Sequence, residues 1–189
     1  EHIGRASEAF AGYNEYAGRV IEDRTANPRD DLMSVLCHAE VDGDRLDQGS
    51  LIFESLLILI GGDETTRHVI SGGGWQVLRD RDQWERLVAD PSLLTSGIEE
   101  MLRWVSPIKN MARIATRDVE VAGQQVQEGQ KLLLLYPSAN RDEAVFVDAD
   151  RFMPDRPNAR RHLAFGHGIH RCVGARLSEL QLEVLISEM

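Results

Sequence analysis

The sequence is poor in cysteine and in basic residues, and each shortage argues against a class of protein. Its 189 residues include two cysteines, Cys37 and Cys172. Two cysteines cannot build a disulfide framework, which favours a reducing compartment such as the cytoplasm. Lysine and arginine number 21 against 31 aspartates and glutamates, so the formal net charge is -10. We expect no nucleic-acid partner, because binding to a phosphate backbone requires a basic surface.

The sequence also lacks an apolar run long enough for a membrane span. Its most apolar window, Leu51 to Ile60, contains eight apolar residues in ten, whereas a span requires about 20. We therefore predict a buried helix here. The chain starts at Glu1 without a signal segment and stops at Met189 inside an apparent amphipathic helix. We expect a partial domain, truncated at both ends.

The order of hydrophobic patterns predicts a mainly α fold with a small β insert. Three glycines, residues 72–74, weaken the longest predicted helix by about 1 kcal/mol each relative to alanine. The loop from about 137 to 164 is longer than an ordinary connection, which points to function. Residues 1–189 form one domain, with a long helix at about 47–72, a helix at about 93–105, the β insert at about 111–136, the irregular segment 137–174 and a final helix from about 173.

The stretch "AFGHGIHRCVG" carries the strongest chemical signal. Cys172 lies just before the final predicted helix, whose positive dipole end favours an anionic sulfur, and the thiolate is the form that binds metals. Gly166 and Gly168 permit a tight loop over the sulfur. Gly174 leaves room for a flat ligand, and His170 could donate to an acidic group on that ligand.

Two other interpretations of this stretch stay open on the residues alone. The first is a glycine-rich loop that holds a small buried cysteine. The second is a zinc site formed by His167, His170 and Cys172, although no paired ligands stand at the conventional zinc spacing.

The spacing F-G-x-G-x-H-x-C-x-G closely resembles the heme-binding loop of the cytochrome P450 family. The resemblance implies that Cys172 is the axial thiolate ligand of the iron of heme b, that His170 contacts a heme propionate and that Phe165 packs beside the sulfur. Gly166 and Gly174 take the loop positions of the motif. Thiolate ligation pushes electron density toward the iron and favours O–O cleavage.

A second match lies in the long predicted helix. "GGDETT" follows five consecutive apolar residues, and it resembles the family's oxygen-activation motif, glycine-glycine-x-acid-threonine. The resemblance implies that Glu64 relays protons and that Thr65 holds water or dioxygen. The alternative is an acid–hydroxyl pair exposed to solvent.

Two further matches concern structure and cofactor contacts. The family has a Glu-x-x-Arg pair joined by a later arginine, and Glu100, Arg103 and Arg156 fit these places. Such a trio would hold the segment before the cysteine loop, since arginine and carboxylate bond in a bidentate manner. Arg113 fits a family arginine that reaches a heme propionate; the alternative is an ordinary edge-strand residue. The motifs occur in the family's order and imply the C-terminal heme-binding core of the cytochrome P450 fold.

The sequence departs from the family pattern after the cysteine loop. The family has leucine-alanine-arginine where this chain has Leu177, Ser178 and Glu179. Cys37 matches no family site, and we predict that it is a core residue.

Two stretches, "LLILIGGDETTRH" and "EEMLRWVSPIKNMAR", resemble those of actinobacterial members that oxidise the side chain of cholesterol and cholest-4-en-3-one (steroid 26-monooxygenases). This implies an apolar small-molecule substrate, dioxygen, and electrons from a ferredoxin and a ferredoxin reductase. A heme-binding sensor and a heme-free, non-catalytic fragment are the alternatives. Apolar positions near the motifs are candidates for the substrate pocket or simply for the core: Ile58, Gly61, Val105, Ile108 and Met111.

Overall fold

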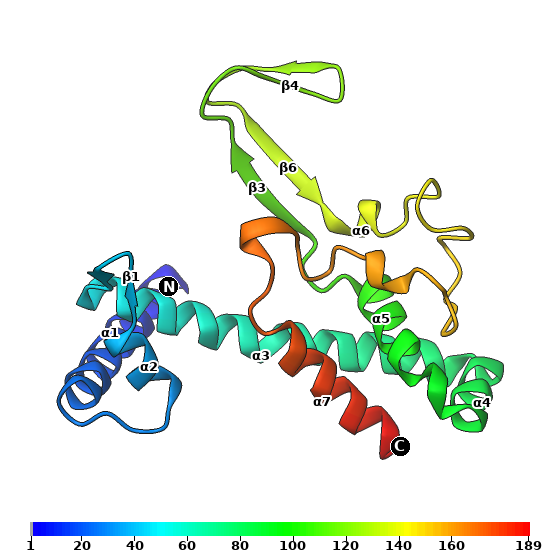
Figure 1. Ribbon diagram of the computed structural model, residues 1–189, viewed down its shortest axis with the longest axis horizontal. Coiled ribbons are helices and arrows are strands. Elements are labelled where there is room, and N and C mark those ends of the chain that lie inside the picture. Colours follow the sequence, from blue (N-terminus) through cyan, green and yellow to red (C-terminus); the bar gives the residue numbers. More distant parts are fainter. Residues whose placement is uncertain (1) are drawn as a thin grey trace. The chain divides into compact units, whose positions relative to one another are not determined.

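Helices dominate the computed structural model, which describes residues 2–189 and, among their side chains, those from residue 4 onward. The chain divides into two compact units, residues 1–63 and 64–189. The long helix α3 (Gln48–Arg79) begins in the first unit and ends in the second (Figure 1).

The first unit is a helical unit with one small hairpin. Its buried apolar side chains are Ala17, Ile21 and Leu51, and Tyr13 and Ser55 share a hydrogen bond of 2.8 Å between their hydroxyl oxygens. The elements are α1 (His2–Ala26), α2 (Leu32–His38), β1 (Glu40–Val41), β2 (Asp44–Arg45) and the first part of α3.

Helix α2 begins after a charged cap. The Asp31 carboxylate accepts from the backbone N–H of Ser34 at 2.8 Å and from Arg24 Nε at 2.5 Å. The Arg24 and Ser34 hydrogen bonds lower the pKa of Asp31 from 3.8 to about 2. The cap therefore stays ionised at neutral pH and favours the start of a helix too short to be stable alone.

The second unit is built around helix α5, whose residues 97–103 are all buried. The helices and turns of this unit are the last part of α3, α4 (Arg81–Ala89), η1 (Pro91–Leu93), α5 (Leu94–Val105), α6 (Tyr136–Ala139), η2 (Ala159–Arg161), η3 (Gly168–His170) and α7 (Ala175–Ser187). Side chains from α3, α4, α5, α7 and the irregular segment form its apolar core: Val69, Val77, Leu87, Ile98, Met101, Leu102, Phe152, Ala164, Leu182 and Ile186.

Helix α3 is longer than predicted. The glycines at 72–74 were expected to end it near residue 72, but it continues to Arg79. The reason is packing against α5. A Cβ at Gly73 would lie 2.9 Å from the Met101 side chain, and a Cβ at Gly72 would lie 3.1 Å from Val105. The two glycines allow close contact between the helices, so tertiary packing offsets their low helix propensity.

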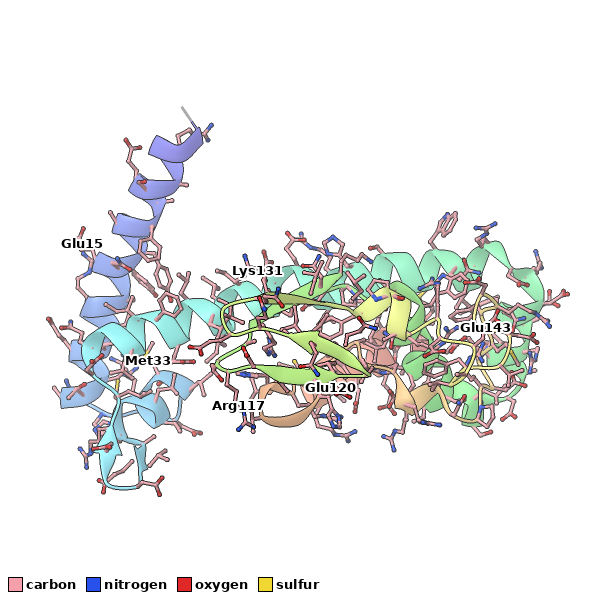
Figure 2. All side chains as sticks on the ribbon, turned by 90° about the horizontal axis from the view of Figure 1, so that it is seen from above. Glu15, Met33, Arg117, Glu120, Lys131 and Glu143 are labelled. Carbon is pink, nitrogen blue, oxygen red and sulfur yellow. The ribbon has the colours of Figure 1, made fainter. Side chains whose placement is uncertain are left out.

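The β insert consists of two antiparallel pairs. Strand β3 (Asn110–Ile114) pairs with β6 (Lys131–Leu135), with Arg113 opposite Leu132. Between them, β4 (Val119–Val121) pairs with β5 (Gln124–Val126). The labelled side chains Arg117, Glu120 and Lys131 are exposed on these strands and turns (Figure 2).

Two predictions about burial are wrong. The apolar window of α3 was expected to be buried, but Phe53 is 64% exposed and Ile60 is 61% exposed. Cys37 is only half-buried. Apolar composition predicted a buried face, but among the described residues no element covers these side chains. Across the described residues, no helix is both long and apolar enough to cross a bilayer.

Candidate cofactor-binding site

The cysteine loop closes on itself before α7 (orange in Figure 1). Gly166 and Gly168 both have φ of 71°, in the left-handed region that favours glycine. The backbone N–H of Cys172 donates to the carbonyl of Phe165 at 2.8 Å. This bond ties the two ends of the loop together, and the thiol of Cys172 is left exposed.

Gly174 lies beside the sulfur. A Cβ at this position would make ordinary van der Waals contact with Cys172 Sγ, at 3.8 Å. Helix α7 starts at the next residue, so the cysteine loop leads directly into the N-terminus of this helix.

Arg113 and His170 line one cavity of about 220 Å³, although 56 residues separate them in the chain. The strand β3 supplies Arg113 and the turn η3 supplies His170. Arg113 is exposed, and its Nη1 donates to its neighbour's carbonyl at 2.9 Å. The remaining lining residues are mostly apolar: Leu134, Leu135, Tyr136, Ala139, Leu163 and His167.

These residues fit a flat, largely apolar ligand that carries acidic groups. The apolar wall suits a macrocycle, and a cation and an imidazole at the rim suit carboxylates. The exposed thiol and the side-chain-free Gly174 lie in the same loop as His170. Heme matches each of these features.

The structure brings Glu100, Arg103 and Arg156 together in a fully buried cluster. Arg103 binds both carboxylate oxygens of Glu100, at 2.6 and 2.8 Å, and Arg156 Nε binds one of them at 2.9 Å. Their side chains are at most 2% exposed. The remaining guanidinium N–H groups donate to backbone carbonyls of the irregular segment, those of Asn140, Val147, Asp148, Ala149 and Arg151.

Glu64 and Thr65 lie in the middle of α3. The Glu64 side chain is 56% exposed and forms an ion pair with Arg67, with His68 Nδ1 at 3.6 Å. Thr65 is half-buried. Its neighbour Thr66 donates to the hydroxyl of Ser178 in α7 at 3.1 Å. This bond joins the helix of the acid–alcohol pair to the helix that follows the cysteine.

The predicted substrate-lining residues have different environments. Val105 is half-buried and packs against the core of the second unit, which favours the core interpretation for this residue. Ile108 is half-buried, and Met111 is 45% exposed. In α3, Ile58 is 37% exposed and Gly61 is exposed.

Sequence reasoning missed a second polar cluster beside the cysteine loop, in which Glu99 and His162 are buried and Arg160 is exposed. Glu99 accepts from His162 Nε2 at 2.9 Å and from Arg160 Nε at 2.9 Å. Burial acts to raise the pKa of Glu99, but these two hydrogen bonds outweigh it and hold the pKa below 4.5. No local spacing signals the cluster, because Glu99 lies more than 60 residues from Arg160 and His162 and meets them only after folding.

The zinc alternative finds no support. Among the residues that the structure describes, no group of three or more His, Cys, Asp and Glu side chains is arranged to hold a metal ion.

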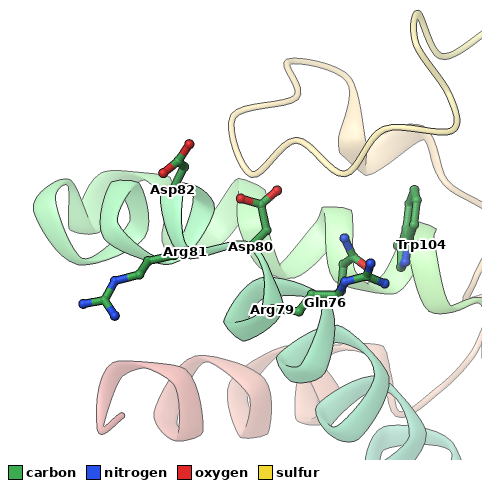
Figure 3. Close-up of a pocket in the computed structure, with 6 residues that line it drawn as sticks. All are labelled: Gln76, Arg79, Asp80, Arg81, Asp82 and Trp104. Atoms are coloured by element: carbon green, nitrogen blue, oxygen red, sulfur yellow. The ribbon is translucent and has the colours of Figure 1, made fainter.

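A larger cavity, of about 540 Å³, lies away from the cysteine where α3 meets α4. Two arginines and two aspartates line it, so their formal charges cancel, and Figure 3 shows Arg81 pointing away from the other labelled side chains. Asp80 is already engaged as the cap of α4. This cavity carries no evident chemistry.

Comparison with known proteins finds matches to cytochrome P450 sequences and structures. A family model described as Cytochrome P450 matches residues 75–189. Steroid C26-monooxygenases of Mycobacterium tuberculosis and Mycolicibacterium smegmatis are 53% and 51% identical over 94% and 97% of this chain, and over 48% and 45% of their own lengths. The crystal structure of CYP109E1 from Bacillus megaterium with testosterone superposes with a TM-score of 0.90, at 37% identity, over 97% of this chain and 51% of that one. The chain spans about half the length of these relatives.

Proposed function

Since this chain belongs to the cytochrome P450 family, we propose that it forms the heme-binding part of a monooxygenase that acts on a sterol or another apolar lipid. The family uses heme b as its cofactor. The observation that carries the proposal is the exposed Cys172 thiol in a closed loop, with Arg113 and His170 lining one neighbouring cavity.

Each residue of the site has a proposed task. Cys172 would supply the thiolate that binds the iron. Arg113 and His170 would bind the heme carboxylates, Phe165 would pack beside the sulfur, and Gly174 would keep space for the macrocycle. When bound, heme supplies the metal at which dioxygen is reduced and one oxygen atom is transferred to a C–H bond.

Glu64 and Thr65 are the proposed proton-handling pair. A carboxylate on a solvent-exposed helix surface exchanges protons with water, and a half-buried hydroxyl can pass a proton inward. The Glu64 carboxylate, which pairs with Arg67 on this surface, is the proposed group that exchanges protons with water, and the Thr65 hydroxyl is the proposed group that passes them on.

The substrate and electron donor are inferred from the relatives. Two of them are named steroid C26-monooxygenases, so we infer a sterol or steroid substrate that is oxidised at its side chain. Ile108 and Met111 are proposed substrate-lining residues of the second unit, and Ile58 and Gly61 are proposed ones of the first. A ferredoxin, reduced by a ferredoxin reductase, is the proposed donor.

A reduced-plus-CO absorption spectrum tests the cofactor assignment. The purified chain, supplied with hemin, is expected to show the red-shifted Soret band of thiolate-ligated heme. Cys172→Ala should remove this band, and Cys37→Ala should leave it unchanged. A chain that takes up no hemin, or an unchanged band in Cys172→Ala, would contradict the proposal.

A further inference from the structure

Two consecutive backbone amides at the base of the cysteine loop are held by side chains. The N–H of Leu163 donates to Asn140 Oδ1 at 2.7 Å, and the N–H of Ala164 donates to His162 Nδ1 at 3.0 Å. Asn140 is completely buried, and His162 is 8% exposed. These are buried acceptors placed where the loop leaves the core.

Both acceptors are themselves tied to helix α5 or its end. Asn140 Nδ2 donates to the hydroxyl of Ser106 at 2.8 Å, the residue that ends α5. The other ring nitrogen of His162, Nε2, lies 2.9 Å from the carboxylate of Glu99 in α5. Each loop amide is thus linked through one side chain to the most buried helix of the unit.

The contacts fix the proton of the His162 ring. Because the Ala164 N–H is a donor, Nδ1 must be the unprotonated nitrogen, and Nε2 carries the hydrogen that Glu99 accepts. The imidazole therefore acts as a rigid bridge with one donor and one acceptor. Its ring also packs against Phe165, with centroids 5.6 Å apart.

The bridge acts on Cys172 through a short path. Ala164 precedes Phe165, whose carbonyl accepts the N–H of Cys172 at 2.8 Å. Fixing the Ala164 amide and the Phe165 ring orients the Phe165 carbonyl. The carbonyl in turn fixes the backbone of the cysteine.

We propose that His162 is a positioning residue that holds Cys172 in the geometry needed to ligate heme iron, by linking Glu99 to the Ala164 amide. This inference rests on the proposed function. The hydrogen bond to the Ala164 amide holds the loop backbone that carries the sulfur. The hydrogen bond to Glu99 sets the orientation of the imidazole ring.

Two substitutions separate the two ends of the bridge. In His162→Asn, the side-chain oxygen replaces Nδ1 and can accept from the amide two residues later, but the side chain is too short to reach Glu99. In His162→Gln, the terminal NH₂ replaces Nε2 and can reach Glu99, but the amide of Ala164 loses its acceptor. Arg160→Gln is the matched control, because it removes the other partner of Glu99 and leaves the loop untouched.

The first measurement is the reduced-plus-CO spectrum of the hemin-loaded chain. His162→Asn and Arg160→Gln are expected to keep the red-shifted thiolate band. His162→Gln is expected to shift most of the heme to the shorter-wavelength band that marks loss of thiolate ligation. If the unmodified chain shows no thiolate band, the proposed function fails and this inference fails with it.

The second measurement needs no cofactor. Amide hydrogen exchange in the heme-free chain should be about tenfold faster at Ala164 and Cys172 in His162→Gln, as expected for one lost hydrogen bond. In His162→Asn it should match the unmodified chain. Equal behaviour of the two variants, whether both normal or both impaired, would overturn the positioning role and leave the heme assignment standing.

Discussion

At the scale of single residues, Glu100 is the buried charge at the centre of the Arg103–Arg156 cluster. Its carboxylate is fully buried between Arg103 and Arg156 and also accepts the backbone N–H of Met153 at 2.9 Å. A buried charge without its partner is very unfavourable. Together the two arginines bind five backbone carbonyls of the irregular segment, so this carboxylate indirectly orders the segment that leads to the cysteine loop.

We predict that Glu100→Gln lowers the free energy of unfolding by about 3–5 kcal/mol, because two buried guanidinium groups lose their counter-charge. Urea unfolding followed by circular dichroism measures the change. Glu85→Gln is the control, since Glu85 pairs with Arg81 at 2.8 Å on the surface and should cost less than about 1 kcal/mol. Similar losses in the two variants would disprove the assigned role of Glu100.

The hydroxyl of Thr65 carries a second prediction. In the active holoenzyme, Thr65→Ala should uncouple oxygen consumption from product, because the proposed proton donor is lost. Thr65→Ser should restore coupling, since it keeps the hydroxyl. The ratio of product formed to dioxygen consumed is the measurement. Unaltered coupling in Thr65→Ala would refute the relay and favour a protein that only binds heme.

At the scale of secondary-structure elements, α3 and α5 meet at glycines. We predict that Gly73→Ala destabilises the chain by about 1–3 kcal/mol, because its Cβ would come within 2.9 Å of Met101. Gly74→Ala, which has nothing within 4 Å, should stabilise it by about 1 kcal/mol through helix propensity. Thermal unfolding of both variants provides the comparison. Stabilisation by both would show that the close contact is not restrictive.

The cap of α2 gives a prediction about pH. The pKa of Asp31 is lowered from 3.8 to about 2 by Arg24 and Ser34, so the folded state binds this proton less readily than the unfolded state. The stabilisation is complete above pH 3.8 and is lost as the pH falls toward about 2. Asp31→Ala should lack this contribution at neutral pH. Helical content of residues 32–38, measured by NMR between pH 5 and pH 2, tests it, and a pH-independent α2 would contradict it.

At the scale of the whole molecule, many large apolar side chains are exposed, and exposed apolar surface favours association. These include Phe53, Leu57, Leu59, Ile60, Leu133, Leu135, Ile169 and Val173. We predict that the 189-residue chain associates with itself as its concentration rises. Sedimentation velocity should show this, and Leu57→Glu with Ile60→Glu should reduce it. The control is Glu54→Gln, on the same helix, and a monomer at all concentrations would contradict the prediction.

The sequence by itself determined the family and the mainly α fold, and the comparisons confirm both. It did so because the cysteine loop and the acid–alcohol motif are local: their spacing is set by the geometry of one loop and one helix turn. The Glu-x-x-Arg pair is local for the same reason. The two steroid C26-monooxygenases are 53% and 51% identical to this chain over most of its length, in agreement with the family that these motifs indicate.

Only the tertiary structure decided the continuation of α3 to Arg79, the exposure of its apolar window and the bridge from Glu99 through His162 to the cysteine loop. Each depends on contacts between residues far apart in the chain. A glycine is read from sequence as a helix breaker, but against Met101 it is what allows the helices to touch. A histidine two residues before a glycine-rich loop has no recognisable spacing, and it gains a role only when folding places a carboxylate beside it.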